Sequence, residues 1–96
     1  MQHLPVTANA ILQGFHVVRL IDIVYHASVT FGPLRYRFTA LHRNEIALRA
    51  RNALEQTAQE KQANAILGYR LREFAVPGMI MAIASGRIVV VERLKQ

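Results

Sequence analysis

The stretch Phe15–His26 reads FHVVRLIDIVYH, and its run of Val and Ile residues predicts a β-strand. Side chains alternate between the two faces of a strand. One face would carry Val17, Arg19, Ile21, Ile23 and Tyr25, and the other would carry Val18, Leu20, Asp22, Val24 and His26. Because both sets are mainly apolar, both faces of the sheet that contains this strand need cover.

A long helix is predicted after the turn signal Phe31-Gly32-Pro33. We expect it to begin at about Leu34 or Thr39 and to end at Gln62. Its packing side is rich in alanine, which lets a helix approach a sheet closely; the residues are Ala40, Ile46, Ala47, Ala50, Ala53, Leu54 and Ala58. Leu41 and Leu48 stand one heptad apart on the opposite, polar side, so we expect them to contact another subunit.

Further stretches complete the predicted elements. Leu4–Thr7 would be a short edge strand, and Ala65–Ala75 alternates as a longer one. Met79–Ser85 and Ile88–Val91 are strand-like on either side of Gly86. That glycine marks either a hairpin turn or a bulge within one bent strand.

These elements predict one α+β domain spanning residues 1–96, in which a small antiparallel or mixed sheet packs on one long helix. A single helix covers only one face of a sheet, so the other apolar face needs a partner. The composition agrees, because 52% of the residues are hydrophobic, whereas a chain this short buries only about 60–65% of its unfolded surface. Large exposed apolar patches mark interaction sites, so we expect a homo-oligomer.

The composition also excludes several chemistries. The chain has no cysteine, which rules out disulfides, thiolate metal sites and cysteine nucleophiles and favours a reducing compartment. Met1–Pro5 lacks the basic and apolar regions of a signal peptide. The longest apolar run, Met79–Ala84, is too short to span a bilayer. We therefore expect a cytoplasmic protein without a membrane segment.

Three motifs carry a resemblance to a known family. Ala63–Gly68 reads ANAILG at the end of the predicted helix, and Met79–Gly86 reads MIMAIASG before the apolar run Ile88–Val90. Together with Ile11–Gly14 (ILQG) ahead of the first long strand, they resemble the YbjQ-like family of small bacterial domains. The resemblance implies a subunit fold like that of dodecin and assembly as a homopentameric ring. Members of the family are sometimes labelled heavy-metal-binding.

Asp22 stands out among the acids, because a carboxylate within an apolar strand needs compensation. We predict a buried or interfacial ion pair with Arg70 or Arg72 of another strand, in preference to a catalytic acid. General acid–base catalysis usually needs a second titratable group within reach of the first. Glu73 and Glu92 are the only other strand carboxylates, and the sequence places neither of them beside Asp22. The sequence also lacks Walker, Rossmann and Gly-x-Ser-x-Gly motifs. We therefore predict no catalytic residue and no cofactor.

The chain is basic, with 12 Lys and Arg against six Asp and Glu. Arg43, Arg49 and Arg51 form a candidate surface for nucleic acid or another polyanion, although a solvated helix face is the favoured interpretation. The four histidines lack the spacing of metal ligands, so no metal site is predicted. These observations favour a non-enzymatic homo-oligomeric module. Nucleic-acid binding is the alternative, and metal or small-molecule binding between subunits is a weaker one.

Overall fold

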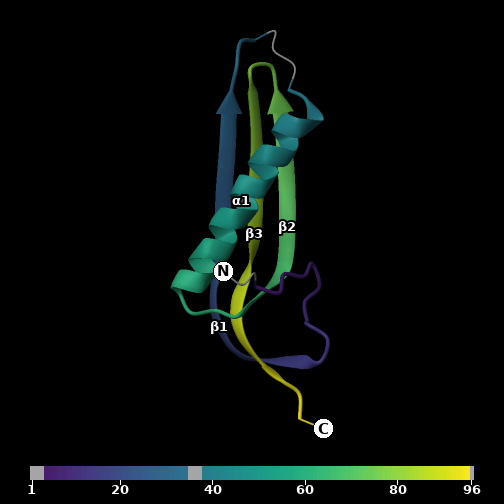
Figure 1. The fold of residues 1–96 in the computed structure, drawn as a ribbon, viewed down its shortest axis with the longest axis vertical. Coiled ribbons are helices and arrows are strands. Elements are labelled where there is room, and N and C mark those ends of the chain that lie inside the picture. The colour runs from purple at the N-terminus through teal and green to yellow at the C-terminus, as the bar shows by residue number, and fades with distance from the viewer. Residues whose placement is uncertain (1–3, 35–37, 96) are drawn as a thin grey trace.

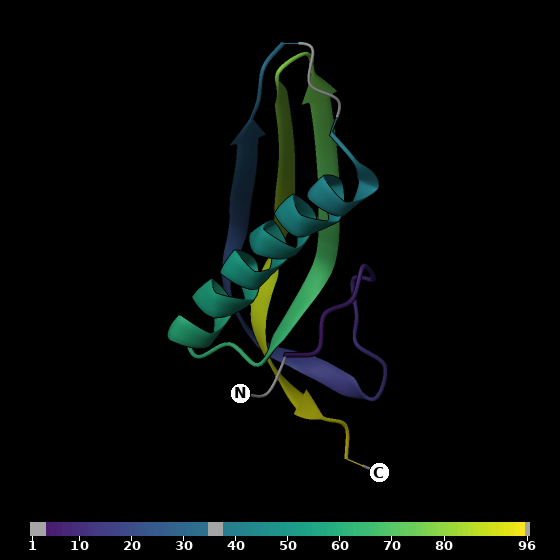
Figure 2. The same cartoon turned by 45° about the horizontal axis from the view of Figure 1, so that its top comes forward.

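The computed structural model describes residues 4–34 and 38–95 of the chain. Within these residues the elements are, in order, β1 (Phe15–Phe31), α1 (Ala40–Glu60), β2 (Ala65–Val76) and β3 (Met79–Arg93). Strand β3 lies in the centre of the sheet and pairs antiparallel with β1 on one side and β2 on the other. The helix crosses one face of this sheet (Figure 1 and Figure 2). The predicted α+β class, with one helix on a small antiparallel sheet, is confirmed.

Helix α1 begins where its sequence provides a cap. The Thr39 hydroxyl accepts a hydrogen bond of 3.3 Å from the backbone N–H of His42. The His42 ring in turn accepts one from the backbone N–H of Thr39. This reciprocal pair satisfies backbone donors that a helix N-terminus otherwise leaves free. The helix therefore begins at Ala40, one residue after the later of the two predicted starts, and ends at Glu60, two residues before Gln62.

Small residues line the contact between helix and sheet. The buried residues of this core are Ile46, Ala50, Leu54, Ala58, Ala63, Ile66, Ile80, Ala82, Ala84 and Ile88. Every second residue of β3 from Ile80 to Ile88 is buried, as strand alternation requires. The alanine-rich packing side predicted for the helix is confirmed at Ala50 and Ala58, whereas Ala40 at the helix start is exposed.

Strand β3 continues through Gly86 without a turn, so this glycine marks no hairpin and no bulge of its own strand. The irregularity lies in the neighbouring strand, where the pairing with β3 shifts between Leu67 and Arg70. Gly68 in this bulge has a φ of +62°, a conformation that glycine adopts without steric cost. The bulge turns Tyr69 towards the helix-side core, while Leu67 packs in the second cluster of buried residues.

Register shifts in β1 correct the predicted facing of that strand. They leave Val18 and Ile21 without partners on β3. Each extra residue inverts the alternation of the side chains that follow it. Ile21 and Val24 therefore both pack against the helix-side core, whereas strict alternation predicts them on opposite faces.

The residues before β1 pack around the end of the sheet that lies near both termini (Figure 1). The predicted edge strand Leu4–Thr7 is reduced to one parallel bridge, between Val6 and Ile66. Leu12 and Phe15 pack against a small cluster formed by Ala65, Leu67, Val89 and Val91, which alternate with the helix-facing residues of their strands. This segment covers only that end of the second face of the sheet.

Candidate functional site

The open face is the surface of the three strands that neither α1 nor the N-terminal segment covers. The strand register sets four rows of side chains across it, from the β2–β3 turn towards the termini: Phe31–Met79–Val76, Val29–Met81–Phe74, Ala27–Ile83–Arg72 and Tyr25–Ser85–Arg70. The first two rows are entirely apolar, and Phe31 is 76% exposed. The open face therefore changes along its length from an apolar half to a basic half.

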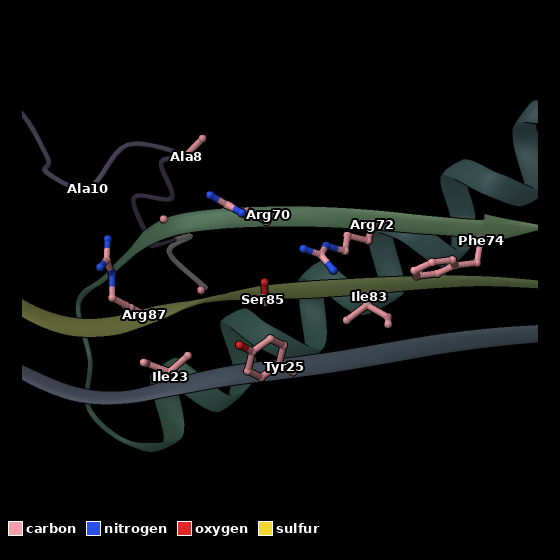
Figure 3. A pocket seen from close by; sticks show the side chains of 12 residues that line it. Ala8, Ala10, Ile23, Tyr25, Arg70, Arg72, Phe74, Ile83, Ser85 and Arg87 are labelled. Atoms are coloured by element: carbon pink, nitrogen blue, oxygen red, sulfur yellow. The ribbon is translucent and has the colours of Figure 1, made fainter.

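The basic half is hollowed, with a volume of about 550 Å³ (Figure 3). We call this depression the arginine hollow, after Arg70 and Arg72 of β2 and Arg87 of β3. Its apolar lining includes Ile23, Tyr25, Phe74 and Ile83, and α1 lies behind the sheet in this view. In residues 4–34 and 38–95, none of the three guanidinium groups has an ion pair or a hydrogen bond.

The predicted ion pair between Asp22 and Arg70 or Arg72 is wrong within the chain. Asp22 is half exposed, and its Oδ2 lies 3.0 Å from Nζ of Lys61, just after the end of α1. Its Oδ1 accepts a hydrogen bond of 2.8 Å from the backbone N–H of Ile23. The Lys61 hydrogen bond, followed by the Ile23 bond, lowers the pKa of Asp22. Asp22 pairs with Ile88 of the helix-side core and so lies on the helix side of the sheet. Both arginines line the open face (Figure 3).

The candidate polyanion surface on α1 consists of three exposed arginines in different surroundings. Arg51 already has partners, because its Nε lies 3.8 Å from Oε1 of the buried Glu55 and its guanidinium lies 5.5 Å from the centre of the Tyr69 ring. Burial is the main cause of a raised pKa at Tyr69. Polyanion binding through Arg43, Arg49 and Arg51 stays a prediction, and Arg51 is the member with a structural role.

The two leucines predicted to contact another subunit are both exposed in the single chain. Leu41 is 66% exposed and Leu48 is 58% exposed. These large apolar side chains on one solvated helix face are a candidate contact surface, separate from the open face. Their contact with another subunit stays a prediction.

Two of the histidines have structural contacts. Nε2 of His26 lies 2.7 Å from Oγ1 of Thr57 and so links β1 to α1, while His42 belongs to the helix cap. Across the described ranges, no group of three His, Cys, Asp or Glu residues is placed to hold a metal ion. The same ranges contain no helix that is both long and apolar enough to cross a membrane.

Comparison with known proteins identifies a fold. No family model matches the sequence, and none of the curated proteins matches it. Among solved structures, the chain is similar to a protein of unknown function from Pediococcus pentosaceus ATCC 25745 that belongs to the DUF74 family. The TM-score is 0.69, with 14% sequence identity over 93% of this chain and 98% of that one. DUF74 is the YbjQ-like family, so the resemblance found in the sequence is confirmed at the level of structure: the chain has the fold of a DUF74 protein.

Proposed function

We propose that this protein is a non-enzymatic homo-oligomeric module, assembled through the apolar half of the open face into a ring of five subunits. The observation that carries the proposal is an accessible surface too large for a compact monomer. The chain exposes 6900 Å². A compact monomer of its mass, 10.9 kDa, exposes about 5600 Å². The excess of about 1300 Å² is surface that a subunit can bury against its neighbours.

The shape of the subunit supports the same conclusion. Its extents are 58 × 22 × 22 Å and its radius of gyration is 15.6 Å, whereas a compact chain of this length has a radius of gyration of about 12.5 Å. A subunit of a ring has two neighbours and, at about 800 Å² for each contact, buries about 1600 Å². The excess surface of about 1300 Å² is comparable with the area that a ring subunit buries.

A ring also needs two different contact surfaces on each subunit, because its interfaces are head-to-tail. The apolar half of the open face is one candidate. The second candidate contact surface is the side of α1 that carries Leu41 and Leu48 and points away from the sheet. The number five rests on the resemblance to the YbjQ-like family, which implies a homopentamer.

The test is to place a charge in the apolar half and measure the sedimentation of the variant. Val29→Asp is suitable because Val29 is 37% exposed in the single chain, so the subunit itself tolerates the change. Gln13→Asp adds the same charge at an exposed residue of the N-terminal segment and is the matched control. We expect Val29→Asp to lower the sedimentation coefficient while its circular dichroism stays that of the wild type. Identical sedimentation of both variants and the wild type would show that this face is not an interface.

A further inference from the structure

We propose that the arginine hollow binds the phosphate groups of a small ligand whose flat, apolar part lies against the wall that contains Tyr25. The ligand class is a nucleoside phosphate or a molecule of the same build. This site uses residues of the sheet and is separate from the candidate polyanion surface on the helix.

The three arginines are brought together by the strand pairing. Arg70 and Arg72 are two residues apart on β2, so their side chains leave the same face of the strand about 7 Å apart. Arg70 pairs with Ser85, and Arg87 follows Ser85 by two residues on the neighbouring strand. All three side chains line the same hollow (Figure 3).

A neighbouring glycine leaves room for the guanidinium group of Arg87. A Cβ atom at Gly68 would lie 3.2 Å from Nη2 of Arg87, closer than an ordinary contact, so the missing side chain makes room for the guanidinium group. Gly68 belongs to the β2 bulge that precedes Arg70. The guanidinium of Arg87 therefore lies beside this bulge, next to the strand that carries the other two arginines.

The charges in the hollow have no counterpart within the described part of the chain. Glu73, next to Arg72 in the sequence, does not line it. Among the described residues, Glu55 pairs with Arg51 and Asp22 pairs with Lys61 instead. Three guanidinium groups offer five N–H donors each, in a planar fork that matches the oxygens of a phosphate. Their mutual repulsion falls when a multivalent anion binds between them.

The other half of the hollow is suited to a flat apolar group. Tyr25 is 68% exposed and Ile23 is 54% exposed, so both offer free surface beside the arginines. Phe74 and Ile83 extend this wall. A volume of about 550 Å³ lies within the range of about 300–1,000 Å³ that small-molecule sites occupy.

The distribution of charge favours a small ligand over a polynucleotide. A strand of nucleic acid follows a basic groove and needs cations along its path. On the open face, the arginines gather in one half. The two rows nearest the β2–β3 turn, which contain Phe31 and Val29, are apolar. The basic surface therefore spans the phosphates of one small molecule.

The test is calorimetric titration at low salt with ADP, inorganic pyrophosphate and adenosine. The hollow variant is Arg70→Gln/Arg72→Gln, and the control, Arg43→Gln/Arg49→Gln, removes the same charge from exposed residues of α1. We expect ADP to bind the wild type and the control with affinities within about twofold, and the hollow variant at least about tenfold more weakly. Tyr25→Ala should weaken the binding of ADP without changing the affinity for pyrophosphate. Adenosine alone should give no measurable binding.

Three results would overturn the proposal. They are no ADP binding by the wild type, equal losses in the hollow variant and the control, and an oligonucleotide that binds the wild type far more tightly than ADP does. Arg87→Lys keeps the charge but loses the planar fork, so it should weaken ADP binding severalfold and provides a second independent variant. Sedimentation of each variant shows whether the assembly is intact, so failure of this site and failure of the oligomer are distinguishable.

Discussion

Gly86 lies so close to Ile66 that a Cβ atom at residue 86 would be 2.6 Å from Cγ2 of Ile66. Real Cβ atoms do not approach other atoms so closely. Ile66 is fully buried in the core between α1 and the sheet. The glycine in the middle of β3 is therefore required by packing, and it lets the neighbouring strand place a large side chain under the helix.

We expect Gly86→Ala to destabilise the fold by about 1–3 kcal/mol, because overpacking a tight core forces side chains or backbone to shift. Urea denaturation at fixed protein concentration measures the change. Ser85→Ala, one residue earlier and on the opposite face, is the control and should stay close to the wild type. A Gly86→Ala variant as stable as the wild type would show that Ile66 has room to move.

Asp22 should contribute to stability only through an exposed pair. Its lowered pKa means that the folded chain keeps this carboxylate charged at a lower pH than the unfolded chain does. The contribution is therefore present above the ordinary pKa of 3.8 and is lost as the pH falls through the lowered value. We expect Asp22→Asn to be slightly less stable than the wild type near neutral pH and equal to it in strong acid.

Thermal melts of both proteins across this pH range, at low and high salt, check the prediction for Asp22. Salt should shrink the difference, because ions screen exposed charges. A large loss of stability on substitution at neutral pH would mean that Asp22 is buried in the assembled protein.

Arg51 and Arg49 should differ in their effect on stability, although both are exposed arginines of α1. Arg51→Ala removes the ion pair with Glu55 and the contact with the Tyr69 ring, at a cost of about 1 kcal/mol. Arg49→Ala should stay within about 0.5 kcal/mol of the wild type, as surface substitutions usually do. Chemical denaturation of the two variants decides, and equal stability would remove the structural role assigned to Arg51.

Leu48 should matter for association more than for folding. Leu48→Glu places a charge on an exposed helix surface, so helicity by circular dichroism should stay that of the wild type while the oligomer dissociates at higher subunit concentration. Asn52→Glu, one helical turn along the same helix, is the matched control. Unchanged dissociation of the Leu48→Glu oligomer would exclude this surface from the subunit contact.

Local sequence signals predicted the elements well. The alanine-rich period of α1 and the Val- and Ile-rich strands all appear in the structure, and Thr39 marks the helix start by its own side chain. The bulges were not predictable in this way, because an unpaired residue such as Ile21 depends on the register with a distant strand. The wrong ion-pair partner predicted for Asp22 has the same cause, because the bulge before Arg70 decides which face of the sheet Arg70 and Arg72 occupy.

The arginine hollow was only half visible in the sequence. Alternation along β2 places Arg70 and Arg72 on one face, which the structure confirms. The contribution of Arg87 and Tyr25 follows from the pairing of three strands, and no local pattern encodes that register. The burial of Glu55 was missed for a related reason, since a carboxylate on the polar side of a helix ordinarily remains solvated.

Native mass spectrometry of the wild-type protein at micromolar subunit concentration measures whether the chain assembles and into how many subunits. Assembly through the apolar half of the open face into a ring of five predicts a main species of five times the chain mass of 10.9 kDa. A different multiple would contradict the ring of five while retaining self-association. A single species at 10.9 kDa, with the apolar rows of the open face left in water, would contradict the account.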